Sequence, residues 1–274
     1  MKEKRGQVTI FIVIGILIVA AIVLVSLYTQ GIILPLGQEE SKAILGSQVE
    51  PLRSFASECI ERTSVDALNF IGEHAGYENF VGEGLNSIDF AGEKVVVVVR
   101  TENGFANRLP SKDGFERAFA GYINNGGGNQ LDSCINNFAS FETQGFSISQ
   151  RSREITADLS EETVNVKVDW TIDLKRGRAR IPVEVPNVII LMNAEKALRV
   201  ANDIVNSEAS GIEFEGLEHD KYITEHPFTL RSIDIASQNY PTANQKVFMI
   251  TTIPKSPGEE EFRFYFAVDR SIPL

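Results

Sequence analysis

The stretch VTIFIVIGILIVAAIVLVSLY, residues 8–28, decides how the rest of the chain is built. It contains no charged residue, and about 20 apolar residues in a helix cross the roughly 30 Å hydrocarbon layer of a membrane. A helix satisfies its own backbone hydrogen bonds in lipid, so this segment is expected to be helical despite its many Ile and Val residues. We therefore predict a transmembrane helix over residues 7–30, preceded by a basic N-terminus, residues 1–6.

The charges on either side of this segment predict its orientation. Lys2, Lys4 and Arg5 precede it, and the first charges after it are Glu39 and Glu40. Because positive residues stay on the cytoplasmic side, the N-terminus is expected in the cytoplasm and the C-terminal domain outside the cell membrane. A cleaved secretory signal peptide is the alternative, but its apolar region is typically 7–15 residues long.

The residues at the start of the apolar run carry a family resemblance. Lys4-Arg5-Gly6-Gln7, followed at once by that run, resembles the class III signal of archaeal type IV pilin-like proteins. The resemblance implies that a membrane peptidase cuts between Gly6 and Gln7 and that the apolar helix stays on the mature protein. Phe11 stands at the fifth mature position, where many pilins carry Glu, so filament assembly is less supported than membrane insertion.

The composition limits the possible partners. The whole chain has a formal net charge of −11, and the part after the apolar stretch has 23 basic and 36 acidic residues. An acidic domain repels phosphate backbones, so nucleic acid is excluded as a partner. Membrane lipid, other envelope proteins and further copies of the chain are the expected partners.

The remaining pattern predicts an extracytoplasmic α+β domain of antiparallel sheets packed with helices, over residues 47–274. Residues 31–46, with Pro35 and Gly37, are expected to form a juxtamembrane linker. The domain could form two lobes, residues 47–145 and 146–274, although no linker divides them. Periodicities of 3.6 and 2 residues predict helices at 47–71, 115–122, 131–141 and 188–206, and strands at 87–90, 94–100, 155–159, 164–174, 181–185, 230–235, 247–253 and 262–268.

Scattered positions carry a second resemblance. Pro51-x-x-Ser54, Cys59-Ile60-Glu61, Ala67-Leu68, Ile71-Gly72 and Gly76-Tyr77, with Cys134-x-x-x-Phe138 further on, are similar to a set of uncharacterised single-pass membrane proteins of small-genome archaea. The resemblance implies an envelope protein and no particular activity.

The two cysteines, Cys59 and Cys134, each lie on the apolar face of a predicted helix. An even number of cysteines in an exported domain predicts a disulfide, and two buried free thiols are the alternative. A bond would pack the helix at 47–71 against the helix at 131–141, with Phe55, Ile60 and Phe138 among the residues around the sulfurs.

Other polar clusters are better explained as surface loops. His219, Asp220 and His226, with Glu213, Glu215 and Glu218, fit neither a helix face nor a zinc signature, and the glycine-rich residues 124–129 lack the Lys of a phosphate-binding loop. The basic residues Lys175, Arg176, Arg178 and Arg180 are expected in a solvated hairpin turn, with anionic lipid headgroups or acidic glycans as the alternative contacts. We expect no metal, no cofactor and no catalytic residue.

Three functions therefore remain open. The first is a non-enzymatic, membrane-anchored cell-envelope protein, pilin-like at its N-terminus, whose ectodomain mediates surface or self-association contacts. The second is an anchored module that binds an extracellular ligand, and the third is a surface hydrolase with a carboxylate-based site. A binding module or an enzyme should show a concave pocket with a polar rim.

Overall fold

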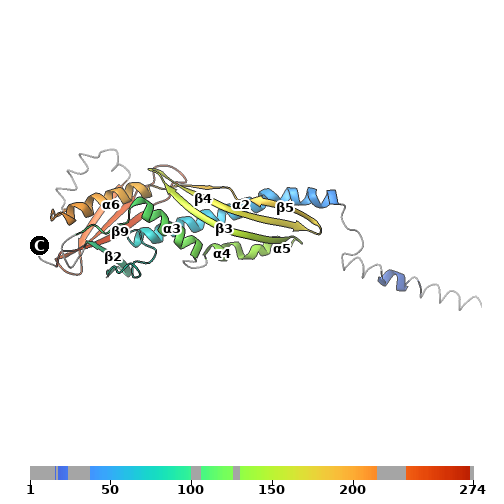
Figure 1. Cartoon of the computed structure of the whole chain (residues 1–274), viewed down its shortest axis with the longest axis horizontal. Helices are drawn as coiled ribbons and strands as arrows, with labels where there is room; N and C mark the ends of the chain where they lie inside the picture. Colours follow the sequence, from blue (N-terminus) through green and yellow to red (C-terminus); the bar gives the residue numbers. More distant parts are fainter. Residues whose placement is uncertain are drawn as a thin grey trace, which may run out of the picture.

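One long helix, α2 (Gln38–Glu73), runs along most of the molecule (Figure 1). The computed structural model describes residues 16, 18–23, 38–99, 106–125, 130–214 and 233–271. At 1.5 Å per residue the 36 residues of α2 span about 54 Å. Apolar side chains recur along the buried face of α2, at Leu45, Leu52, Ala56, Ile60, Ala67, Leu68 and Ile71.

The N-terminal part of α2 differs from the sequence prediction. We predicted a linker over residues 31–46 and a helix beginning near Ser47, but the helix already begins at Gln38. Pro51, which we placed in a first turn, lies inside the helix. Leu45, buried against the core one turn and a half before Pro51, helps to explain why the helix extends so far toward the N-terminus.

A four-stranded antiparallel sheet packs on the first half of α2. It contains β3 (Ser147–Leu159), β4 (Thr163–Arg176), β5 (Ala179–Glu184) and β6 (Val188–Leu191), with β4 paired to the other three. The alternation that predicted β4 is confirmed, because Val164, Val166, Trp170, Ile172 and Leu174 are all buried in the core shared with α2.

A five-stranded sheet lies at the other end of the molecule, in the order β1-β2-β9-β8-β7. Its strands are β1 (Ser87–Phe90), β2 (Glu93–Val99), β7 (Ile233–Asn239), β8 (Gln245–Thr252) and β9 (Arg263–Asp269). The valine run 95–99 is buried on both faces, as predicted. The pairing of β2 with β9 is parallel, so the prediction of purely antiparallel sheets is wrong for this pair.

The shorter helices cover the sheets. Helix α3 (Lys112–Asn125) packs on β3, and α6 (Ala194–Ala209) packs on β2, β8 and β9. We predicted one helix over 188–206, but 188–191 form β6 and the helix begins only at Ala194. The β-branched residues Val188, Ile189 and Ile190 favour a strand, and β4 offers them a free edge.

The predicted helix at 131–141 is also broken. It consists of α4 (Gln130–Ile135), the 3₁₀ turn η1 (Asn136–Phe138) and α5 (Ala139–Glu142). Asn136, Asn137 and Phe138 have positive φ angles of 44°, 50° and 58°. Asn adopts this left-handed conformation more readily than most residues, and the reversal lets Phe138 and Phe141 both enter the core.

The sheets do not follow the two lobes that we considered. Strands β1 and β2 come from residues 47–145, whereas β7, β8 and β9 come from residues 146–274, and the five share one sheet. The larger of the two hydrophobic clusters in the described residues extends from Leu45 on α2 through both sheets to Val268 on β9. The smaller cluster, within the five-stranded sheet, contains Val95, Val97, Val247 and Ala267. The α+β class is confirmed, and α2 joins the two sheets in one continuous packing unit.

Candidate functional site

The structure joins Cys59 on α2 to Cys134 on α4 in a disulfide, with the two Cα atoms 5.7 Å apart. The predicted contact between these two helices is therefore confirmed. Phe55 lies in edge-to-face contact with both Phe138 and Phe141, at ring-centroid distances of 6.0 and 5.8 Å. Arg62 donates a hydrogen bond from Nη2 to Cys134 Sγ over 2.6 Å.

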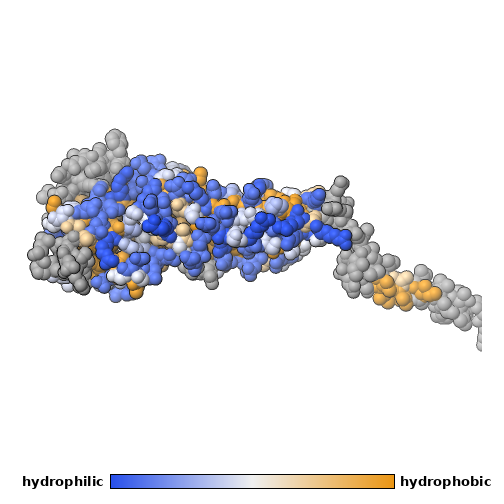
Figure 2. All heavy atoms as spheres, in the orientation of Figure 1, coloured by the Kyte–Doolittle hydropathy of each residue, from blue (hydrophilic) through white to orange (hydrophobic). Residues whose placement is uncertain are grey.

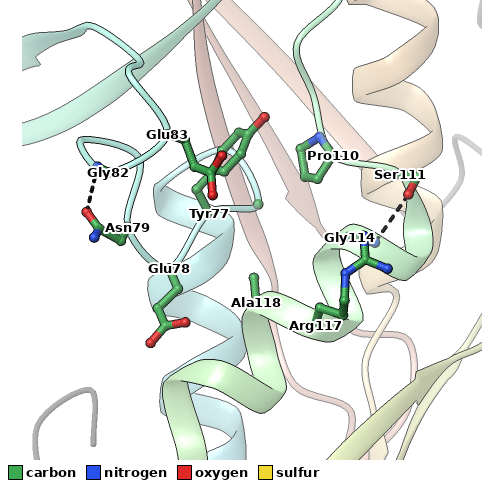
Figure 3. A pocket seen from close by; sticks show the side chains of 11 residues that line it. Tyr77, Glu78, Asn79, Gly82, Glu83, Pro110, Ser111, Gly114, Arg117 and Ala118 are labelled. Carbon is green, nitrogen blue, oxygen red and sulfur yellow. Dashed lines mark hydrogen bonds between the residues drawn. The ribbon is translucent and has the colours of Figure 1, made fainter. Parts of the chain in front are cut away.

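The concave site with a polar rim lies elsewhere, in a cleft of about 610 Å³ beside the C-terminal end of α2. One wall comes from the turns after α2 and the other from the first turns of α3 (Figure 3). The walls carry charged and polar side chains, among them Tyr77, Glu78 and Glu83 on the first and Ser111 and Arg117 on the second.

Local hydrogen bonds fix both walls of the cleft. The Gly82 amide donates to Asn79 Oδ1 at 3.0 Å, and the Gly114 amide donates to Ser111 Oγ at 3.2 Å. The Tyr77 hydroxyl donates to the Arg108 carbonyl oxygen and so ties the first wall to the segment that leads into α3. Gly76, with φ at +89°, approaches Pro110 so closely that a Cβ would lie 2.4 Å from Pro110 Cγ.

Burial perturbs two ionisable groups in the cleft. Burial raises the pKa of Glu78 above its ordinary value, and the same cause raises the pKa of Tyr77, although Arg108 opposes the shift. The Glu78 carboxylate packs on the α3 backbone at Gly121, where a Cβ would come within 2.2 Å of Oε2. This combination of carboxylates, a guanidinium and a phenol can hold a small polar molecule by hydrogen bonds.

The basic residues predicted in a hairpin turn lie where β4 turns into β5. Arg180 donates to Asp173 Oδ2, and Arg151 Nε on β3 lies 3.7 Å from the same oxygen. The hydrogen bond from Arg180 lowers the pKa of Asp173, and the positive charges of Arg180, Arg151 and Lys175 lower it further, although burial opposes the shift. The guanidinium of Arg176 lies over the Phe146 ring, 5.2 Å from its centroid.

The glycine-rich residues 124–129 are only partly described. Asn124, near the end of α3, makes two hydrogen bonds with the backbone of Ile155: Nδ2 donates to the carbonyl oxygen at 2.6 Å, and Oδ1 accepts from the amide at 3.0 Å. Asn124 therefore docks α3 on β3, which supports the structural interpretation of this segment rather than a phosphate-binding one.

Several predicted positions lie outside the described residues. These include the processing site Gly6 and Gln7, and His219, Asp220 and His226. Within the described ranges, no three His, Cys, Asp or Glu residues are grouped as a metal site requires. In the same ranges, no helix is both long and apolar enough to cross a membrane.

Comparison with known proteins gives no relative: no family model, no curated protein and no solved structure matches the chain. Its class is therefore defined by its own architecture, an elongated α+β domain built on one long helix and closed by a disulfide.

Sequence analysis missed Arg62 and the whole cleft. Arg62 lies three positions after Cys59, on the helix face that also meets α4, so helical spacing could have indicated it. The cleft brings together two segments about 35 residues apart in the sequence. The only signal in the sequence is the set of glycines Gly76, Gly82 and Gly84, which indicates tight turns after α2.

Proposed function

We propose that this chain is a non-enzymatic, membrane-anchored cell-envelope protein, pilin-like at its N-terminus, whose ectodomain mediates surface or self-association contacts. The exposed apolar side chains near the N-terminus carry this proposal. Ile16, Ile18, Val19, Ile22 and Val23 are helical and 49–64% exposed (Figure 2). A row of exposed apolar side chains needs a bilayer or a bundle of like helices to cover it.

The position of α2 supports the same function. The proposed span, residues 7–30, contains no charged residue, and α2 begins at Gln38. Helix α2 starts eight residues after the proposed span, so a membrane anchor there would be connected to the domain at the N-terminal end of α2. A disulfide in the domain agrees with an oxidising environment outside the cell.

Extraction of membranes with alkaline carbonate tests the anchor. The full chain should stay in the membrane pellet, whereas a Val19→Arg/Ile22→Arg chain should appear in the supernatant. Each Arg near the middle of a transmembrane helix costs about 2.5–3.5 kcal/mol on insertion scales. The intact mass of the pelleted protein also reports whether the mature chain begins at Gln7.

A matched pair controls for the added charge. Val81→Arg/Ile212→Arg changes two domain side chains that are 70% and 56% exposed, and this chain should remain in the pellet. Extraction of the unaltered full chain by carbonate would refute the anchor. Electron microscopy of the pelleted material then separates a filament, which buries the apolar helix in a bundle, from dispersed single molecules.

An anchored ligand-binding module is the second candidate, and the cleft favours it. The cleft is polar, its walls are fixed by hydrogen bonds, and it lies beside the C-terminal end of α2, far from Gln38. A ligand held there would be presented away from an anchor at the N-terminus.

A further inference from the structure

The turn between β4 and β5 lies level with the start of α2 (Figure 1). Arg53 on α2 donates from Nε to the Glu184 carbonyl oxygen on β5, at 3.2 Å, and so fixes the two elements side by side. From that contact, fifteen helical residues back to Gln38 cover about 23 Å. Seven residues of strand back to Gly177 also cover about 23 Å. The hairpin turn and the start of α2 therefore share one end of the domain.

The length of the connection limits how far this end can lie from the anchor. Between residue 30 and Gln38 the chain spans at most about 30 Å, whatever its conformation. The opposite end of α2, at Glu73, lies about 54 Å further on. The hairpin is therefore the described surface that a membrane anchor would hold nearest to the bilayer, together with the first turns of α2.

The charge of the hairpin is opposite to that of the domain. Lys175, Arg176, Gly177, Arg178 and Arg180 follow one another within six positions, in a part of the chain with 23 basic and 36 acidic residues. Asp173 is the one acidic residue among positions 172–181, and it is shared by Arg180 and Arg151. Because the single carboxylate of Asp173 balances only one positive charge, the guanidinium groups of Arg151 and Arg180 keep a net positive charge.

The remaining cations are available to a partner. Among the described residues, Lys175 and Arg178 have no carboxylate within 4.0 Å, and Arg178 is exposed. Arg176 is held over the Phe146 ring, which fixes its guanidinium near the turn without neutralising it. Beside the ion pair of Arg180 with Asp173, the turn thus presents three cations, Lys175, Arg176 and Arg178, that no carboxylate pairs with in the described part of the chain.

We propose that the β4–β5 turn, through Lys175, Arg176 and Arg178, binds the anionic headgroups of the bilayer in which the chain is anchored. The proposal rests on the proposed function, because the anchor is what brings the turn to the lipid. Basic residues next to an anionic membrane are attracted to its surface, and the attraction decreases within a Debye length. The acidic remainder of the domain is repelled, so the domain would stand with this end toward the membrane.

A fluorescence experiment on the full chain tests the proposal. The sequence contains two cysteines, and both are in the disulfide, so one introduced cysteine can be labelled selectively. Ser147→Cys places a label beside Lys175, its partner across β3 and β4. Ala243→Cys places a label in the turn before Gln245, which pairs with Asp269 at the opposite end of the molecule.

Each labelled chain is reconstituted in phosphatidylcholine bilayers with and without phosphatidylglycerol, using a headgroup-attached quencher. Phosphatidylglycerol should increase quenching at position 147 and leave position 243 unchanged. About 1 M salt shortens the Debye length to about 3 Å and should abolish the increase. Lys175→Gln/Arg178→Gln should remove at least about half of the increase, because each cation contributes to headgroup attraction.

Arg199→Gln/Lys255→Gln is the matched control, because it removes the same number of positive charges. Both residues are exposed, and neither lies at the hairpin. This control should keep the whole increase. Equal quenching at position 147 in the two lipids would overturn the proposal.

Flotation of the same vesicles separates this proposal from the proposed function. Chains that float with both lipids but show no lipid-dependent quenching keep the anchor and refute the headgroup contact. Chains that do not float with either lipid refute the anchor itself. Lipid-dependent quenching that survives both salt and Lys175→Gln/Arg178→Gln would assign the contact to other groups and overturn the proposal.

Discussion

At the scale of single residues, the bond between Cys59 and Cys134 closes a loop with a sequence separation of 75. On the chain-entropy model such a cross-link stabilises the folded state by about 4 kcal/mol. Cys59→Ala and Cys134→Ala should therefore destabilise by similar amounts. The double variant should be no worse than either single variant, because the same bond is lost in all three. Denaturant unfolding under oxidising conditions measures these differences.

Reduction supplies the control for the disulfide variants. With a thiol reductant present, the unaltered chain should unfold at nearly the denaturant concentration of the double variant. Additive losses in the double variant would instead show that each side chain stabilises the fold through separate contacts, such as the hydrogen bond from Arg62 to Cys134.

At the scale of elements, two glycines of α2 should respond oppositely to alanine. A Cβ at Gly72 would lie 2.2 Å from the Arg263 carbonyl oxygen and 2.8 Å from the Phe262 ring, where α2 meets β9. Gly72→Ala should destabilise by about 1–3 kcal/mol, or by more if the backbone of β9 cannot move. Gly46, on the same helix, has no heavy atom within 4 Å of the added Cβ. Gly46→Ala should therefore stabilise by about 0.5–1 kcal/mol.

Thermal unfolding of the two variants under identical conditions checks this pair. Because both substitutions lie in α2 and add one methyl group, helix propensity raises stability in both cases. The difference between them then reports the packing of α2 on β9. A stabilised Gly72→Ala chain would contradict the close approach of the two elements.

The elements that were predicted correctly from the sequence have a hydrophobic pattern that fits only one type of secondary structure. The alternation of β4 and the row Phe262, Phe264, Phe266 and Val268 have a period of two, and the structure buries one side of each. Prediction failed where two structures fit one pattern. Val188–Leu191 continue the apolar spacing of α6, and only the unpaired edge of β4 makes them a strand. A left-handed break at Asn136 likewise depends on where Phe138 and Phe141 can pack.

At the scale of the whole molecule, acid should weaken the fold through carboxylates in both halves. The hydrogen bond from Arg180, and the charges around it, lower the pKa of Asp173. Burial raises the pKa of Glu259, but donors from the Lys255 and Ser256 backbone and from Asn193 outweigh burial and lower it overall. A carboxylate whose folded pKa lies below its unfolded value stabilises the fold above that unfolded value, about 3.9 for Asp. This stabilisation is lost as the pH decreases through the folded pKa.

The unfolding free energy of Asp173→Asn relative to the unaltered chain measures this effect. Asp173→Asn should be clearly less stable at pH 7, and the gap should narrow below about pH 4. Replacing the Glu78 carboxylate by Gln should instead raise the unfolding free energy at pH 7. Burial raises the pKa of Glu78, so its ionisation opposes folding at neutral pH. Asp89→Asn, at an exposed ion pair with Lys94, should change little at any pH. A gap at Asp173 that does not depend on pH would contradict the role of its charge.

Whether a candidate site could be predicted depended on how close its residues lie in the sequence. The basic turn was found from sequence because its residues are contiguous, but its place level with the start of α2 was not. The disulfide was found because both cysteines lie on apolar helix faces. The cleft was missed because Glu78 and Arg117 line one cavity only after α3 has packed beside the end of α2.

The position of β9 in the centre of its sheet has a consequence for the order in which the chain folds. Its neighbour β2 precedes it by about 170 residues, and Val97 pairs with Ala267. During synthesis, β2 is therefore complete long before its partner strand β9, because most of the chain lies between them. During that interval Val95–Val99 present an apolar strand with an open edge, which is prone to aggregation. We therefore expect the valine strand to need protection until synthesis is nearly complete, and under the proposed function a chaperone or a slow export step would supply it.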